Sequence, residues 1–552
     1  MIRRHTVGLI ATAGIAVFLF FGLAWISLPG PDADEVLFIT VWYRHSPTAF
    51  YVDYFRVFHS DLVSMVGSYV GALKGWVWSP FFALGRSVYS LRVPAVLLAG
   101  ATLALFFLWM RQFYSAATAT VALLLAATDP TYINSSRIDY GPVVLQRLLL
   151  MTGIATGTRW LFGPGRSERR WIWLAASGFS FGLALWDKAT FGWCLIALAA
   201  TLLVLFPREV QRRLRPRPAA LFLLFLCLGA FPLIRFNLRY PKAGTRSVTA
   251  LEVFDADIYD VKWKSFLTTL TGSYLYGYTG GTLHDGGAVR TVDDAGQQFL
   301  DALACFHPYY GTLMSWSLTA TLLVAAVAAW RHRRAVLFPL ALSLAHFAAV
   351  FLTRGAGGAH HFTLVYPFPH LAIAAAGLWT WESVSRLPVL PAAVLRRVLV
   401  IALVTVVAVQ IAYNARQLSA FRQVRGDGIW SDAIYDIAAH LKATRPDLVV
   451  DLDWGFGYPL MFLTDDAVPQ NEYYAHVAFG NPADEDPLMK RLEPLLDRPN
   501  ALFLVHVGRF IRFPAVMPVF ERGLKRAGKR ARVVRTFYQA SGEALAQLVR
   551  LE

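Results

Sequence analysis

The chain has 552 residues, of which 56% are hydrophobic and only 16% charged, and its formal net charge is +16. Soluble globular proteins carry about 25% charged residues, so most of this chain must be solvated by lipid. In a soluble protein such a positive charge would suggest a nucleic-acid partner. Here the arginines gather in short loops between apolar segments, where they set membrane topology instead, so we expect no nucleic-acid partner. The three cysteines are far apart and form neither a metal motif nor a disulfide framework.

Apolar segments that approach the length of a membrane span, about 20 residues, recur along the chain. The first is too long for a typical signal-peptide core and lacks a clear cleavage pattern, so we expect a retained anchor. The pattern predicts about eleven transmembrane helices, over residues 7–28, 91–110, 115–130, 141–162, 171–187, 189–206, 219–238, 308–330, 335–353, 362–381 and 398–413.

Basic residues gather in alternate loops of this pattern, which places all of them on one side of the membrane. By the positive-inside rule that side is cytoplasmic, and the N-terminus lies inside. The residues are Arg3, Arg4, Arg166, Arg169, Arg170, Arg208, Arg212, Arg213, Arg215, Arg217, Arg331, Arg333, Arg334, Arg386, Arg396 and Arg397.

The outer side then carries two long loops, 29–90 and 239–307, and the C-terminal tail. In the first loop the half-apolar pieces 50–59 and 62–84 predict helices that lie in the membrane interface. The tail predicts a helix over 429–444, strands over 448–452 and 501–507, a helix over 514–527 and a strand over 530–538. We therefore expect a mainly α, polytopic transmembrane domain over 1–413 and a small soluble α/β domain over 414–552.

No acid lies deep in any predicted span, although transporters usually need one near the midplane, so the pattern argues against a carrier. Acids and bases gather instead at the outer ends of the spans. This mixture indicates chemistry on a head group at the membrane surface. The acids are Asp32, Asp34, Glu35, Asp53, Asp129, Asp139 and Asp187, and the bases Arg44, Arg137, Lys188, Arg354, His360 and His361.

Three short motifs occur at this outer side: Asp34-Glu35 after the first span, Ser136-Arg-Ile-Asp-Tyr-Gly-Pro142 before the fourth, and His360-His-Phe-Thr-Leu-Val-Tyr-Pro-Phe-Pro369. With this topology they resemble the glycosyltransferase C superfamily, in its branch of protein O-mannosyltransferases and lipid A aminoarabinose transferases. The resemblance covers about residues 1–413. It departs from the family pattern at Ile138 and at the Gly-Pro that follows Tyr140.

The resemblance implies a polyprenyl-phosphate sugar as donor, a lipid, glycan or protein as acceptor, and an inverting hexosyl- or pentosyltransferase. Such a reaction needs a base for the acceptor, and a carboxylate suits this role. Asp34 is the first candidate and Glu35 the second, against the plain interpretation of solvated loop acids. The family generally needs no metal. However, Asp32-Ala-Asp34 also has the spacing of a metal motif, with Asp32 as a candidate ligand of a divalent cation.

The remaining candidates would bind substrate. Arg137 and Arg147 suit a phosphate, because guanidinium makes bidentate contacts, unless they pair with acids or extend to the interface. Asp139 either binds the acceptor, orients a cation or caps a helix. Lys188 is a candidate or an ordinary turn residue.

Two further candidates lie beside aromatic and glycine-rich segments. Arg354, His360 and His361 flank a glycine-rich loop, and we expect donor contact through one histidine. Tyr51 suits stacking on a sugar or isoprenoid, although an interfacial aromatic belt is an equal interpretation.

The leading hypothesis is therefore a multi-pass glycosyltransferase of the inner, or plasma, membrane with its site on the periplasmic, extracytoplasmic side. One alternative is a polytopic scaffold or binding protein of envelope glycan assembly, whose working part would be the tail. Another is a flippase for lipid-linked sugars.

Overall fold

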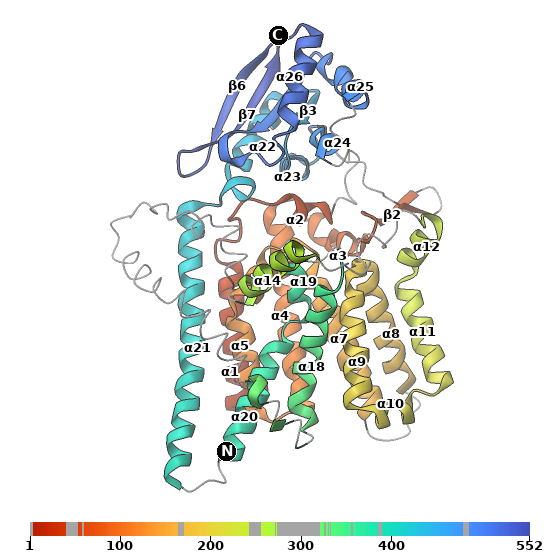
Figure 1. Ribbon diagram of the computed structural model, residues 1–552, viewed down its shortest axis with the longest axis vertical. Coiled ribbons are helices and arrows are strands. Elements are labelled where there is room, and N and C mark those ends of the chain that lie inside the picture. Colours follow the sequence, from red (N-terminus) through yellow and green to blue (C-terminus); the bar gives the residue numbers. More distant parts are fainter. Residues whose placement is uncertain are drawn as a thin grey trace.

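The computed structural model describes residues 4–39, 53–57, 60–163, 170–241, 255–270, 272, 321–324, 327–328, 331, 333–354, 357–384, 389–478 and 485–552. Within these residues the protein is mainly helical. Long helices run side by side as a bundle, and a small α/β unit is stacked on one end of it, far from the N-terminus (Figure 1).

The bundle is built from the apolar segments of the sequence. Four described helices are long and apolar enough to cross a membrane, and four bent helix pairs raise the number to as many as eight. Its helices are α1 (Arg4–Leu23), α4 (Val88–Phe113), α5 (Ala116–Thr128), α6 (Pro130–Arg137), α7 (Val143–Phe162), α8 (Arg170–Asp187), α9 (Gly192–Leu205), α10 (Pro207–Arg213), α11 (Pro216–Gly229), α12 (Phe231–Arg239), α18 (Arg334–Phe351), α19 (Ala359–Phe362), α20 (Phe368–Val384) and α21 (Val389–Val424). The predicted span 308–330 lies largely outside the described residues.

Prolines explain two of the bends. Between α5 and α6 the axis turns by 57°, where Asp129 caps α6 and Pro130 begins it. Between α11 and α12 it turns by 71°, just before Pro232. Proline has no N–H and disfavours helical geometry in the residue before it, so an apolar segment that continues through a proline breaks there.

The first outer loop corrects the sequence prediction. It contains α2 (Ala33–Leu37), an antiparallel hairpin of β1 (Asp53–Val57) and β2 (Ser60–Met65), and α3 (Leu73–Phe82). The predicted interfacial helix over 50–59 is therefore wrong in its described part, and that over 62–84 is reduced to α3. Aromatic and β-branched residues here favour a strand. Asp53 holds the hairpin against α12 through Arg235 at 2.6 Å and Arg239 at 3.0 Å.

The C-terminal unit is a five-stranded mixed sheet of order β4-β3-β5-β7-β6. The strands β3 and β5 occur within the predicted ranges, and β6 begins one residue later than predicted. The strands are β3 (Leu448–Asp451), β4 (Gln470–Asn471), β5 (Ala501–His506), β6 (Ala531–Tyr538) and β7 (Ala544–Leu551), with helices α22 (Ala433–Thr444), α23 (Gly457–Leu463), α24 (Tyr474–Ala478), α25 (Glu485–Leu496) and α26 (Val516–Ala527).

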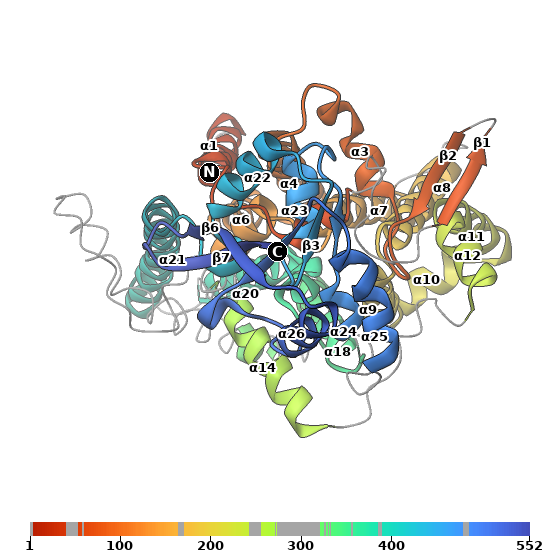
Figure 2. The ribbon, with the colours of Figure 1, turned by 90° about the horizontal axis from the view of Figure 1, so that it is seen from above.

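Alternate residues of the central strands pack on opposite faces of this sheet, as the strand period of two requires. Val450 and Phe503 belong to the core formed with α25 and α26. Val449 and Leu502 belong to the core formed with α22 and α23. The helix α23 also packs on α2, so this second face is turned toward the bundle. Seen from above, the unit covers the bundle over α4, α6 and α20 (Figure 2).

Polar contacts fix the α/β unit on the segment that follows α1. Gly30 donates its N–H to the Trp430 carbonyl at 2.8 Å, and the Tyr435 hydroxyl donates to the Ser27 carbonyl at 2.7 Å. A Cβ on Gly30 would lie 2.3 Å from the Ser431 carbonyl oxygen. The two backbone segments therefore approach each other so closely that only glycine fits at position 30. The first outer loop and the C-terminal unit therefore form one packed surface.

We predict that Gly30→Ala loosens this docking, because the added methyl group must push the two backbones apart at a cost of about 1–3 kcal/mol. Limited trypsin digestion of the protein in detergent should then cut faster near Arg425, between α21 and α22. Gly377→Ala is the matched control, since a Cβ at Gly377 in α20 meets nothing within 4 Å. Equal digestion of the two variants would contradict the close approach.

Candidate active site

The acidic segment after α1 is held in place by Arg92 of α4. Its guanidinium makes two 2.8 Å bonds with the Glu35 carboxylate, through Nε and Nη2. The same group donates to the carbonyls of Ile26 at 3.0 Å, Pro29 at 2.8 Å and Gly30 at 3.2 Å. Both side chains of the ion pair are buried. Glu35 therefore has both oxygens engaged in structure, which leaves it unsuited to be the base.

Asp32 has a structural position as well. It is the N-cap of α2, and its Oδ2 accepts the N–H of Asp34 at 2.9 Å. Among the described residues, no group of three or more His, Cys, Asp or Glu side chains is arranged to hold a metal ion. The role of Asp32 as a cation ligand thus stays a prediction.

Asp34 differs from its two acidic neighbours. It is partly exposed, and in the described part of the chain its carboxylate takes part in no hydrogen bond or salt bridge. Burial raises the pKa of Asp34, and the positive charge of Lys188 opposes that rise. Of the three acids, Asp34 is the one whose oxygens are available to a substrate.

Lys188 lies in the turn after α8, near enough to Asp34 for the two charges to interact. Its Nζ lies 5.6 Å from the centre of the Phe38 ring and 5.8 Å from that of Tyr69. The backbone around it is fixed, because Ala189 donates its N–H to the Tyr69 carbonyl at 2.9 Å. Within the described residues the ammonium group donates no hydrogen bond. Burial lowers the pKa of Lys188 to about 8, although the charge of Asp34 opposes this.

A second base, Lys74 of α3, is bound by Asp139. Its Nζ lies 3.0 Å from the Asp139 Oδ2 and donates to the Asp139 carbonyl at 3.0 Å. The other carboxylate oxygen accepts the N–H groups of Val143 and Val144 at the start of α7. Asp139 is thus both helix cap and partner of Lys74, a residue that the sequence analysis missed. A lysine inside the half-apolar segment 62–84 was the available signal.

The two buried arginines serve the fold. Arg137 donates to the carbonyls at the end of α1, those of Phe21, Ala24, Trp25 and Leu28. Arg147 donates to the Thr363 carbonyl at 2.9 Å and the Ser135 hydroxyl at 2.7 Å. The five bonds of Arg137 occupy all of its N–H groups, whereas Arg147, with one further bond to the Ser136 hydroxyl at 3.4 Å, uses three of its five within the described residues. The phosphate-binding role expected of both arginines stays a prediction. They secure α1, α6, α7 and the segment after α19.

The histidine segment lies beside this site. The rings of His360 and His361 are 3.9 Å apart, and His361 Nδ1 accepts the N–H of Gly357 at 3.2 Å. The charge of Lys188 acts on both rings, which places them close to it. Arg354 is exposed at the surface. Tyr51 lies outside the described residues, so its expected stacking role is not tested.

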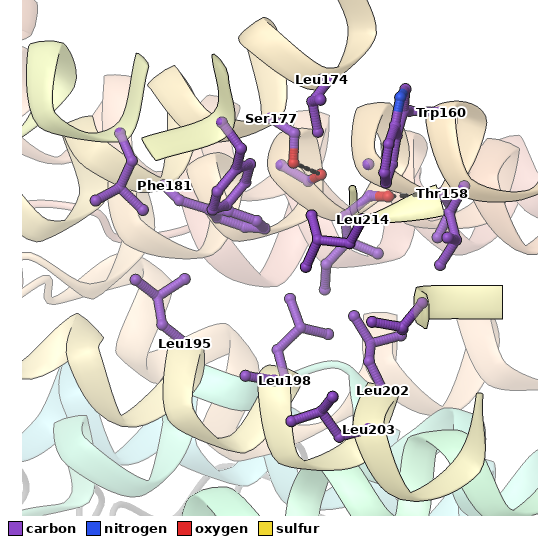
Figure 3. Close-up of a pocket in the computed structure, with 18 of the residues that line it drawn as sticks. Thr158, Trp160, Leu174, Ser177, Phe181, Leu195, Leu198, Leu202, Leu203 and Leu214 are labelled. Atoms are coloured by element: carbon purple, nitrogen blue, oxygen red, sulfur yellow. Dashed lines mark hydrogen bonds between the residues drawn. The ribbon is translucent and has the colours of Figure 1, made fainter. Parts of the chain in front are cut away.

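An apolar cavity of about 360 Å³ lies deeper in the bundle. Leucines of α9, Leu195, Leu198 and Leu202, face Phe181 and Leu174 of α8 across it (Figure 3). Its two hydroxyl groups bond to backbone carbonyls, Ser177 to Gly153 at 2.8 Å and Thr158 to Ile154 at 2.7 Å. The cavity therefore presents hydrocarbon surface to whatever fills it.

Comparison with known proteins agrees with this architecture. Residues 71–235 match the model of the dolichyl-phosphate-mannose-protein mannosyltransferase family. Crystal structures of ArnT from Cupriavidus metallidurans are similar to the whole chain. The apo form has a TM-score of 0.57 at 15% identity and covers 98% of this chain and 97% of its own. The form bound to undecaprenyl phosphate has a TM-score of 0.57 at 14% identity and covers 99% and 98%.

A more distant similarity links the chain to the Archaeoglobus fulgidus oligosaccharyltransferase tethered with an acceptor peptide. Its TM-score is 0.53 at 12% identity, and the match covers 98% of this chain and 74% of that one. No curated protein matches the sequence. The resemblance expected from the sequence is confirmed: residues 71–235 match the mannosyltransferase family model, and the fold of the chain is similar to that of ArnT.

Proposed function

We propose that this protein transfers a sugar from a polyprenyl-phosphate carrier to a hydroxyl or amine of a lipid, glycan or protein acceptor. The observation that carries the proposal is the pair of Asp34 and Lys188, a carboxylate and an ammonium group whose charges act on each other and which, within the described residues, make no side-chain hydrogen bond or ion pair. The similar ArnT structure binds undecaprenyl phosphate, which supports the same kind of donor here.

In the proposed reaction Asp34 is the general base. It takes the proton of the acceptor group as the acceptor atom bonds to the sugar C1, and the bond from C1 to the phosphate oxygen breaks. The electron pair leaves on the lipid phosphate, whose charge Lys188 stabilises. Because one displacement occurs at C1, the anomeric configuration is inverted. Lys74 and Asp139 hold each other and the start of α7 beside this pair.

The apolar cavity offers a place for the prenyl chain. Ser177, at its wall, lies ten residues before Asp187 on α8, which is about 15 Å along the helix axis. A polyprenyl chain whose phosphate contacts Lys188 would extend in that direction, into the bundle. Hydrocarbon surface of the cavity wall suits such a chain, since burial of apolar area stabilises binding.

The side of the membrane follows from the charges. The arginine-rich α10 lies at the end of the bundle opposite to the α/β unit (Figure 1). The positive-inside rule assigns that end to the cytoplasm and supports an extracytoplasmic site, periplasmic if the cell is Gram-negative. The proposal therefore includes a location in the inner, or plasma, membrane with the N-terminus inside.

We predict that Asp34→Asn lowers transfer at least about 100-fold without loss of stability, because it removes the base but no structural bond. The assay presents radiolabelled mannosyl undecaprenyl phosphate, and a panel of other undecaprenyl-phosphate sugars, to membranes that contain the protein. Asp61→Asn is the control, an exposed acid of β2 in the same outer loop. Undiminished transfer by Asp34→Asn would refute the assignment of the base.

Glu35→Gln should behave differently, because it breaks the buried ion pair with Arg92 and leaves that cation without a charged partner. Loss of one member of such a pair costs about 3–5 kcal/mol. The expected result is a lower midpoint of thermal unfolding in detergent, with activity lost in proportion to the folded fraction. A variant that stays fully stable but inactive would instead favour Glu35 as the base.

The Lys188 ammonium predicts an alkaline limit to activity. Its pKa of about 8 means that the charge is present below that pH and is lost as the pH rises through it. The ratio kcat/KM for the donor should fall across this range. Lys188→Arg keeps its charge and should move the fall to higher pH, whereas Lys188→Met should be weak throughout. An unshifted limb in Lys188→Arg would show that another group titrates.

A further inference from the structure

A second cavity, of about 340 Å³, lies between the ends of three helices and has no part in the reaction above. It is lined by the turn between α4 and α5, by the first residues of α18 and by the last turns of α20. Arg334, at the start of α18, bonds to Glu209 of α10 at 2.7 Å. Since α10 lies at the end of the bundle opposite to the α/β unit, the cavity lies at that end as well (Figure 1).

Two side chains of opposite charge line this cavity without an ion-pair partner in the described part of the chain. Arg333 directly precedes α18, Glu382 lies in the last turn of α20, and both are exposed. Arg334 differs from Arg333, because its guanidinium is bound by Glu209. Within the described residues the cavity therefore offers a ligand one cation, Arg333, and one anion, Glu382.

Other lining groups extend these two charges. Trp379 precedes Glu382 by three residues on α20, so the two side chains share one face of that helix. The face of an indole ring attracts cations, as the carboxylate does. Ser115 caps α5, and its hydroxyl oxygen lies 2.9 Å from that of Thr118. That bond uses one of the two hydroxyl hydrogens, so within the described residues the other is left for an acceptor of the ligand.

The lining changes from charged to apolar with depth in the bundle. On α20 it runs from Glu382 through Trp379 to Ala375, about 10 Å along the helix axis. On α18 the exposed Arg333 is followed by the buried Val336. The charged groups thus lie at the end of the bundle and the apolar groups nearer its middle. The head group and the acyl chains of a phospholipid have the same order in one leaflet of a membrane.

Hydrogen bonds hold the walls of the cavity in place. The Tyr114 hydroxyl donates to the Ala335 carbonyl at 3.0 Å, which joins the turn after α4 to the start of α18. The ion pair of Arg334 and Glu209 joins the start of α18 to α10. Because these elements are already fixed, a ligand would not have to order them on binding, which favours affinity.

We propose that this cavity binds the head group of a zwitterionic phospholipid, with the phosphate on Arg333 and the ammonium group on Glu382 and Trp379. Guanidinium and carboxylate make charge-assisted hydrogen bonds with these two groups. A purely anionic head group would place Glu382 near a like charge, which is unfavourable. A soluble phosphate would leave the apolar part of the cavity uncovered. The site lies outside the candidate active site, so this inference does not rest on the proposed reaction.

The test is native mass spectrometry of the delipidated full-length protein in detergent, titrated with dioleoyl phosphatidylethanolamine or dioleoyl phosphatidylglycerol. We expect the zwitterionic lipid to bind about tenfold more tightly, because it alone bonds to Glu382. Arg333→Gln should weaken both lipids about tenfold, because each loses a charge-assisted bond to its phosphate. Glu382→Gln should weaken only phosphatidylethanolamine and bring the two lipids to similar affinity.

Arg331→Gln is the matched control, an exposed arginine of the same segment that does not line the cavity. Equal affinity of the unmodified protein for the two lipids overturns the inference, as does unchanged phosphatidylethanolamine binding in Arg333→Gln. An equal loss in Arg331→Gln would assign the effect to general surface charge and also overturns it. Competition by inorganic phosphate at the concentration of the lipid would identify a site for free anions, not for a lipid. Lipid binding that phosphate leaves unchanged supports the proposal.

Discussion

The site depends on the ion pair of Glu35 and Arg92. A segment that leaves a membrane helix carries backbone carbonyls with no helical partner, and in this protein three of them accept bonds from Arg92. Arg137 satisfies those at the end of α1 in the same manner. The two guanidinium groups replace water at a buried turn. They fix the path of residues 24–35 and so the position of Asp34. A loop whose carbonyls bonded only to water would hold that position less firmly.

A consequence is that charge at this surface is divided between structure and chemistry. The buried acids Glu35 and Asp139 are each neutralised by a base from another helix, which joins the elements together. Asp34 and Lys188 make no such ion pair within the described residues, and their charges act on each other. Because the C-terminal unit is anchored on the same residues that Arg92 organises, the sheet edge with Asp451 and Glu472 and the helix α2 are positioned by one network.

Hydropathy predicted most of the helices of the bundle, because a helix that crosses a membrane can be identified from its length and its apolar composition. The sequence also revealed the acidic motif after α1 and the strands β3 and β5. The hydrogen-bond partners of the buried arginines could not be predicted. Arg137 and Arg147 had the residue type and depth of phosphate ligands, yet both bind backbone carbonyls that lie far away in sequence, those of Leu28 and Thr363 among them. Arg92, the second residue of the predicted span 91–110, was not singled out, because its partners Pro29 and Glu35 lie about 60 residues earlier in the chain.

Other features escaped for a related reason. The hairpin of β1 and β2 depends on Arg235 and Arg239, about 180 residues later, so local periodicity could not reveal it. In the sequence Asp451, at the end of β3, and Glu472, just after β4, are ordinary acids of a soluble domain, and only the parallel pairing of the two strands brings them together.

The most direct test is a cryo-electron microscopy structure with undecaprenyl phosphate bound. The account predicts its phosphate on Lys188, with Asp34 facing the open side where sugar and acceptor would meet. A phosphate held by Arg354, away from Lys188 and Asp34, would contradict it.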